Sequence, residues 1–259
     1  MTRVPALHST DANAALGFAQ RLADITSKLL GDVLLAVNLH GSLTFEDYVP
    51  GPSDIDLLAV VDRPLSDCEI ESLTRTIAAE CGRAPAPADL RFVTRAVAAT
   101  PPETPPLELY IRLRVTGPPE VEVRRQEPDL IVELSICRQQ GDALHGPSPP
   151  QLIGEVPSEW LLRAGDAQLA RWQSLTNEDP YAALMALTAC RIWRFSEERA
   201  HCSKAAAGTW AIARDPSLTA ARDALRQRAG DPVRIAPTEI GRLLRIVRTR
   251  IARKRVAPN

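Results

Sequence analysis

The sequence lacks long apolar runs and contains few aromatic residues. Aromatic side chains make up 4% of the 259 residues, and no run of about eighteen apolar residues, the length that crosses a bilayer, occurs in the chain. The first residues, Met1 to His8, also lack the apolar segment of a signal peptide. We therefore expect a cytoplasmic protein without a membrane partner.

Cysteine and histidine are sparse as well. The five cysteines are odd in number and include no Cys-x-x-Cys pair, so we expect reduced thiols. The four histidines are scattered along the chain and do not predict a zinc site. We expect one of them, His40, to pack beside the Gly-Ser turn that follows it.

An excess of charge of either sign is also absent. The chain has 31 basic and 32 acidic residues and a net charge of −1, so no overall field attracts nucleic acid. The basic segment 242–255 accompanies an apolar stripe at helical spacing, which favours a packed terminal helix with a solvated basic face. We therefore expect no nucleic-acid partner. The length allows one large domain or two of ordinary size.

The first part of the chain, residues 1–156, mixes strand and helix patterns and predicts an α/β domain with a mixed sheet flanked by helices. Pro-rich segments and short turns separate the elements. The expected helices span residues 10–31, 67–81 and 128–141. The expected strands span 33–39, 55–61 and 89–94, and residues 107–115 and 121–124 form either further strands or an excursion from the sheet.

From residue 157 onward the apolar periodicity is helical throughout, and prolines punctuate it. We therefore expect a second domain over residues 157–259, folded as an all-α helical bundle. Its predicted helical blocks are 158–164, 166–173, 180–198, 203–213, 217–229 and 237–254.

One motif, a Gly-Ser step followed by two aspartates, combines residues that suit binding of a metal ion and of phosphate. Gly41-Ser42 leaves an apolar run, and Ser53-Asp54-Ile55-Asp56 enters another. Alternate strand residues point to one face, so Asp54 and Asp56 aim together, roughly 7 Å apart at the backbone. Two carboxylates so placed suit Mg²⁺ with nucleotide phosphates, and the Gly-Ser turn offers N–H groups and a hydroxyl to those phosphates. The pattern predicts nucleotidyl transfer, although a solvated turn that caps backbone N–H groups has a similar sequence.

A third carboxylate completes such a site, by holding metal or by accepting the proton of the nucleophile. Asp89 is the candidate because it stands at the start of the next strand, and Glu108 is the competing choice. The order of helix, strand, Gly-Ser, loop, Asp-x-Asp strand, helix and acid-bearing strand matches the nucleotidyltransferase superfamily typified by DNA polymerase β.

The sequence also resembles a narrower family, the aminoglycoside adenylyltransferases that act on streptomycin and spectinomycin. The resemblance covers most of the chain, and two of its motifs lie outside the core that the superfamily shares. These two are Leu187 to Trp193 and Ser203 to Ala211; the others are Leu39 to Ser42, Ser53 to Leu58, Asp129 to Leu134 and Leu144 to Pro147.

The resemblance implies a nucleotidyltransferase domain and a helical domain with ATP and the drug in the cleft between them. By position, Asp54 and Asp56 would hold Mg²⁺, and Arg191 and Lys204 would reach the phosphates of ATP. The family has a glutamate as catalytic base where this chain has Asp89, which is one methylene shorter. The residues expected to line the triphosphate are Gly41, Ser42 and Ser53.

For the drug site, Trp172 resembles one of two tryptophans in the family, with Glu178 or Asp179 as the acid beyond it. The other tryptophan has no counterpart, because residues 99–116 contain Tyr110 but no Trp. The resulting prediction is a monomeric, ATP- and Mg²⁺-dependent enzyme that attaches AMP to a hydroxyl of an aminoglycoside or aminocyclitol antibiotic. The alternatives are a nucleotidyltransferase acting on protein or RNA, and a non-catalytic ATP-binding sensor.

Overall fold

The computed structural model of the protein describes residues 10–175 and 179–256. The chain divides into two compact units, Met1–Val156 and Pro157–Asn259. Each unit is built around its own set of elements and is considered by itself below.

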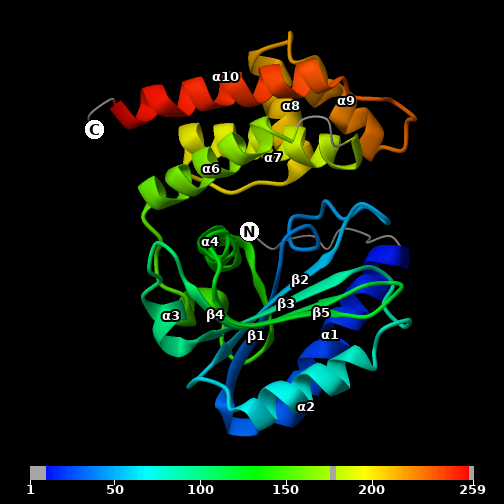
Figure 1. The fold of residues 1–259 in the computed structure, drawn as a ribbon, viewed down its shortest axis with the longest axis vertical. Helices are drawn as coiled ribbons and strands as arrows, with labels where there is room; N and C mark the ends of the chain where they lie inside the picture. The colour runs from blue at the N-terminus through cyan, green and yellow to red at the C-terminus, as the bar shows by residue number, and fades with distance from the viewer. Residues whose placement is uncertain (1–9, 176–178, 257–259) are drawn as a thin grey trace, which may run out of the picture. The chain divides into compact units, whose positions relative to one another are not determined.

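The first unit contains a six-stranded sheet in the order β5-β4-β3-β2-β1-β6 (Figure 1). Strands β2 and β3 are parallel and the other neighbouring pairs are antiparallel, so the sheet is mixed, as predicted. The strands are β1 (Leu34–His40), β2 (Ile55–Val61), β3 (Ala88–Thr94), β4 (Pro106–Leu113), β5 (Glu120–Gln126) and β6 (Asp142–His145).

Helices cover both faces of this sheet and bury the apolar side chains of the strands. On one face lie α1 (Thr10–Leu30), which runs into the short 3-10 helix η1 (Gly31–Val33), and α2 (Asp67–Ala78). Packed on the other face are α3 (Arg95–Ala99), α4 (Leu130–Gln140) and α5 (Pro149–Leu152). Candidate site residues lie on the face that α4 covers.

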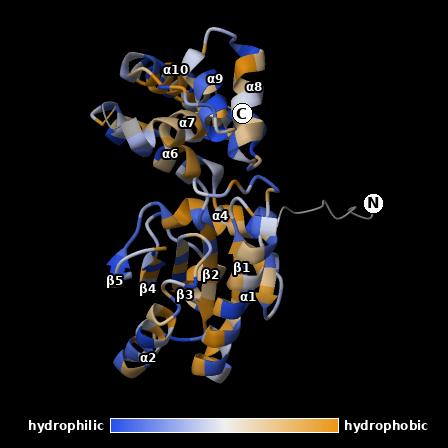
Figure 2. Cartoon of the chain, turned by 90° about the vertical axis from the view of Figure 1, so that its right-hand side faces the viewer, coloured by the Kyte–Doolittle hydropathy of each residue, from blue (hydrophilic) through white to orange (hydrophobic). Residues whose placement is uncertain are grey.

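The position of each strand in the sheet follows its hydropathy. Strands β1 and β2 are buried over nearly their whole length, and β2 is orange in Figure 2. Strand β5 lies at the sheet edge, is largely exposed and is blue in the same view. Charged side chains at such an edge disfavour pairing with another chain. The two segments for which strands were one alternative, 107–115 and 121–124, are strands β4 and β5. Strand β6 was not predicted.

The second unit is all-helical, as predicted. The sequence predicts two helical blocks at 158–164 and 166–173, whereas the structure has one helix, α6. The glycine between the blocks, Gly165, lies inside this helix, and its missing side chain leaves room for the next helix: a Cβ there would lie 2.7 Å from Ile192 Cγ2. The elements are α6 (Ser158–Gln173), the 3-10 helix η2 (Asp179–Tyr181), α7 (Ala182–Glu198), α8 (Lys204–Arg214), α9 (Thr219–Arg228) and α10 (Pro237–Val256).

In the part of the chain that the structure describes, none of the helices combines the length and the apolar character that crossing a bilayer requires.

Candidate active site

A row of polar side chains crosses the sheet on the face that α4 covers. His40 of β1 pairs with Asp56 of β2, Asp56 pairs with Asp89 of β3, and Asp89 pairs with Arg112 of β4. Residues in register on neighbouring strands point to the same face. Asp54 precedes Asp56 by two residues, so in an extended backbone its side chain points to the same face as that of Asp56.

Three carboxylates of this region come together. One oxygen from each of Asp54, Asp56 and Asp89 lies within 4.8 Å of the others. The competing candidate, Glu108, does not join them. It lies near the start of β4, four residues before Arg112, and its Oε2 accepts a hydrogen bond of 3.3 Å from the backbone N–H of Leu65. The structure thus brings Asp89, and not Glu108, to the aspartate pair; we call the three residues the acid group.

Gly41 makes the close packing of the acid group possible. Its φ of +78° is a left-handed conformation, and a Cβ at this position would lie 2.2 Å from Asp56 Oδ2. Gly41 therefore lets the turn after β1 pass directly against one of the carboxylates.

The two serines of the motif hold the connecting loop. The Ser42 hydroxyl donates a hydrogen bond of 3.4 Å to the carbonyl oxygen of Asp54. The Ser53 hydroxyl is buried and accepts a hydrogen bond of 3.0 Å from the N–H of Val49. Both serines thus lie beside the acid group, and both hydroxyls have backbone partners in the 41–54 segment.

Burial and mutual repulsion act on the acid group. The pKa of Asp56 is raised well above its usual range, by burial first and then by the negative charges of Asp54 and Glu133. Burial also raises the pKa of Asp89, against the opposing effect of Arg91 and Arg112. Three carboxylates whose oxygens lie this close together offer the hard oxygen donors that Mg²⁺ prefers, so the residues fit a divalent cation.

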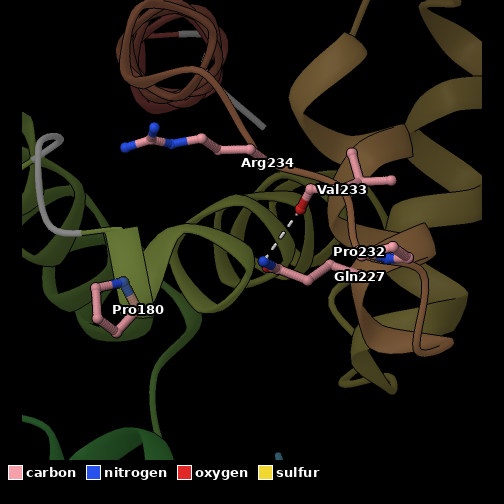
Figure 3. A pocket seen from close by; sticks show the side chains of 5 residues that line it. All are labelled: Pro180, Gln227, Pro232, Val233 and Arg234. Atoms are coloured by element: carbon pink, nitrogen blue, oxygen red, sulfur yellow. Dashed lines mark hydrogen bonds between the residues drawn. The ribbon is translucent and has the colours of Figure 1, made fainter.

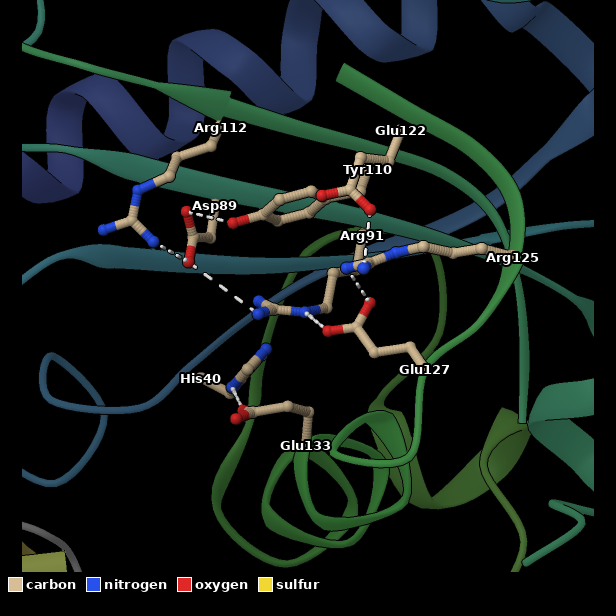
Figure 4. A network of polar contacts seen from close by, with 9 residues as sticks. All are labelled: His40, Asp89, Arg91, Tyr110, Arg112, Glu122, Arg125, Glu127 and Glu133. Atoms are coloured by element: carbon tan, nitrogen blue, oxygen red, sulfur yellow. Dashed lines mark hydrogen bonds and ion pairs between the residues drawn. The ribbon is translucent and has the colours of Figure 1, made fainter. Parts of the chain in front are cut away.

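Asp89 is hydrogen-bonded at both carboxylate oxygens (Figure 4). The Tyr110 hydroxyl donates to Oδ1 at 3.1 Å, and Arg112 Nη1 donates to Oδ2 at 3.2 Å. A second guanidinium, that of Arg91, stands 3.8 Å from Oδ2. The sequence did not single out these three residues. Alternation along β3 puts Arg91 on the face of Asp89, whereas the approach of Tyr110 and Arg112 depends on the register between β3 and β4.

Connected ion pairs of two arginines and two glutamates lie beside the Tyr110 ring. Arg91 Nε lies 3.3 Å from Glu127 Oε1, and Arg125 Nη2 lies 3.3 Å from Glu127 Oε2. Arg125 also pairs with Glu122 at 2.6 Å. Burial and then the charge of Asp89 raise the pKa of Tyr110 to about 12, so its hydroxyl keeps its proton and serves as a donor near neutral pH.

His40 ends β1 and is fully buried beside Gly41, which agrees with the expectation that it packs next to the Gly-Ser turn. Its Nδ1 lies 3.4 Å from Glu133 Oε2 of helix α4 (Figure 4). Glu133 was not singled out in the sequence, because its approach to the sheet depends on how α4 packs.

The remaining candidates belong to the helical unit. Trp172 lies on α6, Arg191 on α7, and Lys204 is the first residue of α8; all three are partly buried. The preceding Ser203 caps α8 by accepting a hydrogen bond of 3.1 Å from the N–H of Ala206. Glu178 lies outside the described residues, and Asp179 is described only in its backbone, as the first residue of η2.

The helical unit also contains a surface hollow of about 350 Å³ (Figure 3). Gln227 donates a hydrogen bond of 3.3 Å to the carbonyl oxygen of Val233 at its wall. Its lining includes the cationic Arg234 and no carboxylate, so the hollow is unsuited to a cationic ligand. The lining residues are Pro180, Gln227, Pro232, Val233 and Arg234.

The sequence model of one protein family, described as "Aminoglycoside adenylyltransferase, C-terminal domain", matches residues 151–250. This range contains every described helix from α6 to α9 and most of α10. The match spans 100 of the 259 residues and lies in the helical part of the chain.

A solved structure has the same fold as this chain. It is the crystal structure of spectinomycin adenyltransferase AAD(9) from Enterococcus faecialis with ATP and spectinomycin. The match has a TM-score of 0.71 and 18% sequence identity, and it covers 91% of this chain and 99% of that one. At this identity the likeness concerns the fold.

Together the two comparisons confirm three predictions from the sequence: the resemblance to aminoglycoside adenylyltransferases, the α/β unit followed by a helical unit, and the assignment to the nucleotidyltransferase enzymes.

Proposed function

We propose that this protein is an ATP- and Mg²⁺-dependent adenylyltransferase that attaches AMP to a hydroxyl of an aminoglycoside or aminocyclitol antibiotic, and so confers resistance. The observation that carries the proposal is the acid group. Three carboxylates within 4.8 Å of one another stand beside a glycine turn that could not carry a side chain. In this proposal, residues 1–156 are the nucleotidyltransferase domain.

In this proposal Asp54 and Asp56 hold Mg²⁺, and Asp89 is the catalytic base. Bound Mg²⁺ supplies positive charge to the triphosphate. The acceptor oxygen forms a bond to the α-phosphorus of ATP while the bond from that phosphorus to pyrophosphate breaks. The proton of the acceptor hydroxyl passes to a carboxylate oxygen of Asp89.

The proposed contacts to the triphosphate come from both units. In the first unit they are the backbone of Gly41 and the hydroxyls of Ser42 and Ser53. The Ser42 hydroxyl would exchange the carbonyl oxygen of Asp54 for phosphate, whereas the Ser53 hydroxyl can donate to phosphate while it still accepts from Val49. In the helical unit they are Arg191 and Lys204, whose guanidinium and ammonium groups suit phosphate oxygens.

The proposed acceptor contacts are Trp172 with Glu178 and Asp179, because an aromatic face and carboxylates attract a cationic drug. The family of residues 151–250 and the spectinomycin named with the solved neighbour support this class of acceptor. We further propose that the protein acts as a monomer in the cytoplasm, on small molecules and without a nucleic-acid partner.

The test is transfer of radiolabel from α-³²P-labelled ATP to a panel of streptomycin, spectinomycin and other aminoglycosides. We expect labelled drug with Mg²⁺, and none with EDTA or with the Asp54→Asn variant. If no drug in the panel accepts label while protein or RNA does, the acceptor class is wrong. If nothing accepts label although ATP binds, the protein is a nucleotide sensor.

A further inference from the structure

The Asp89 carboxylate is held from one side by a single strand. Tyr110 and Arg112 are two residues apart on β4, so both side chains emerge on the face to which Asp89 points. The Tyr110 hydroxyl occupies one carboxylate oxygen at 3.1 Å, and the Arg112 guanidinium occupies the other at 3.2 Å. Two donors on two different oxygens define the plane of the carboxylate as well as its position.

Tyr110 is itself held in place. Its ring has the guanidinium carbon of Arg91 5.1 Å and that of Arg125 5.7 Å from its centroid. Glu127 binds both of these guanidiniums and is buried with the tyrosine. The hydroxyl therefore extends toward Asp89 from a fixed ring (Figure 4).

Compensation of charge does not account for the tyrosine. Arg91 and Arg112 both approach Asp89 Oδ2 and already supply positive charge. The Tyr110 hydroxyl adds no charge, and at Oδ1 it contributes only a directed hydrogen bond. Its contribution to the acid group is therefore orientation.

We propose that Tyr110 and Arg112 are positioning residues that fix the Asp89 carboxylate for its part in the acid group. The inference rests on the proposed function and extends it: because an oxygen of Asp89 lies within 4.8 Å of those of Asp54 and Asp56, the Asp89 carboxylate serves as a third oxygen ligand for a cation at this site as well as accepting the proton. Partners of this kind typically change metal affinity or activity by about 10- to 100-fold when they are removed.

Two substitutions that conserve charge test the proposal. Tyr110→Phe removes only the hydroxyl, and Arg112→Lys keeps the positive charge but replaces the planar guanidinium. The matched control is Arg114→Lys, because Arg114 follows β4, is half-exposed and pairs with Glu120 away from Asp89. Mn²⁺ alone is the probe, measured by calorimetry, with urea unfolding to verify that each variant folds.

We expect Tyr110→Phe and Arg112→Lys each to weaken Mn²⁺ binding about tenfold, and Arg114→Lys to leave it within about twofold. At saturating Mg²⁺, kcat should fall about tenfold while the KM for ATP stays within about twofold. In an Asp89→Ala background, neither substitution should weaken Mn²⁺ binding further, because each acts through Asp89.

Unchanged Mn²⁺ affinity in both folded variants would overturn the inference and leave the proposed function standing. Equal losses with and without Asp89 would also overturn it, because the two residues would then act on the fold in general. A wild-type protein that binds no Mn²⁺ would overturn the proposed function, and this inference with it.

Discussion

At the scale of single residues, the acid group brings three carboxylates together, of which Asp89 is buried and Asp54 and Asp56 are partly exposed. The pKa of Asp56 is raised by burial and by its acidic neighbours, so the folded protein holds this proton more tightly than the unfolded chain does. The contribution of Asp56 to stability is therefore greatest below its unfolded pKa of about 3.9 and decreases as the pH rises through the folded value.

From this sign we predict how Asp56→Asn changes stability with pH. In EDTA, the difference in unfolding temperature, variant minus wild type, should increase as the pH rises from about 4 to 8, because only the wild type acquires the buried charge. Differential scanning fluorimetry across this range measures the difference. The control is Asp62→Asn, which removes a half-exposed carboxylate just after the same strand. Parallel curves for Asp56→Asn and wild type would contradict the prediction.

A second residue-scale prediction compares two glycines that both have positive φ. Gly41→Ala and Gly51→Ala should each cost about 1–2 kcal/mol of stability, because an L-residue is strained in that conformation. Only Gly41→Ala should also displace Asp56, since nothing lies near a Cβ at Gly51. We expect at least a tenfold loss of Mn²⁺ affinity for Gly41→Ala, by calorimetry, and almost none for Gly51→Ala. Equal metal affinities would refute the close-contact argument.

The sequence allowed part of this site to be predicted. The Asp-x-Asp spacing and the start of β3 carry local signals, and Asp54, Asp56 and Asp89 do come together. Tyr110, Arg112 and Glu133 have no local signal of this kind. Tyr110 and Arg112 reach Asp89 through the β3–β4 register, and Glu133 reaches His40 through the packing of α4 on the sheet. Pairing across strands and between layers is tertiary information that residue spacing does not contain.

At the scale of elements, helix α2 shows how local sequence sets a boundary. Ser66 and Glu69 form a reciprocal capping box, and Arg63 pairs with the same glutamate at 2.9 Å. Hydrogen bonds from Arg63 and then from Ser66 lower the pKa of Glu69 to about 2. The helix was predictable because its start signal lies within a few residues.

We predict that Glu69→Gln destabilises the protein by about 0.5–1 kcal/mol at neutral pH, as expected for a cap with a partly exposed ion pair. Because the pKa of Glu69 is lower in the folded protein than in the unfolded chain, this stabilisation is fully present at pH values above the unfolded pKa of about 4.3. It is lost as the pH falls toward 2. Urea unfolding at pH 7 and pH 3 measures the change. The control is Glu71→Gln, which removes an exposed pair with Arg75 on the same helix; an equal loss there would contradict the capping argument.

Other elements depart from local expectation for tertiary reasons. Gly165 suggested a break, yet α6 continues through it, and the glycine is accommodated there because Ile192 of α7 packs closely against this position. Strand β6 is only four residues long and forms by pairing with β1, a partner about a hundred residues earlier in the chain. Neither feature can be read from the segment in which it lies.

At the scale of the whole molecule, the proposed activity requires residues of the helical unit as well as the acid group. We predict that Arg191→Gln and Lys204→Gln each raise the KM for ATP by about tenfold, because each removes a charge-assisted contact to phosphate. Steady-state kinetics with varied ATP measures this. Arg245→Gln, an exposed position on α10, is the control and should leave the KM unchanged. A KM equal to that of wild type in both variants would remove these two residues from the proposed site.

The central claim is that this chain transfers AMP by means of the acid group. Pyrophosphate release, measured with ATP, Mg²⁺ and an aminoglycoside acceptor, tests it most directly. We expect release from the wild type that requires all three components, and a loss of at least about a hundredfold in Asp54→Ala. Wild-type protein that binds ATP but releases no pyrophosphate with any acceptor, or Asp54→Ala protein as active as the wild type, would contradict the account.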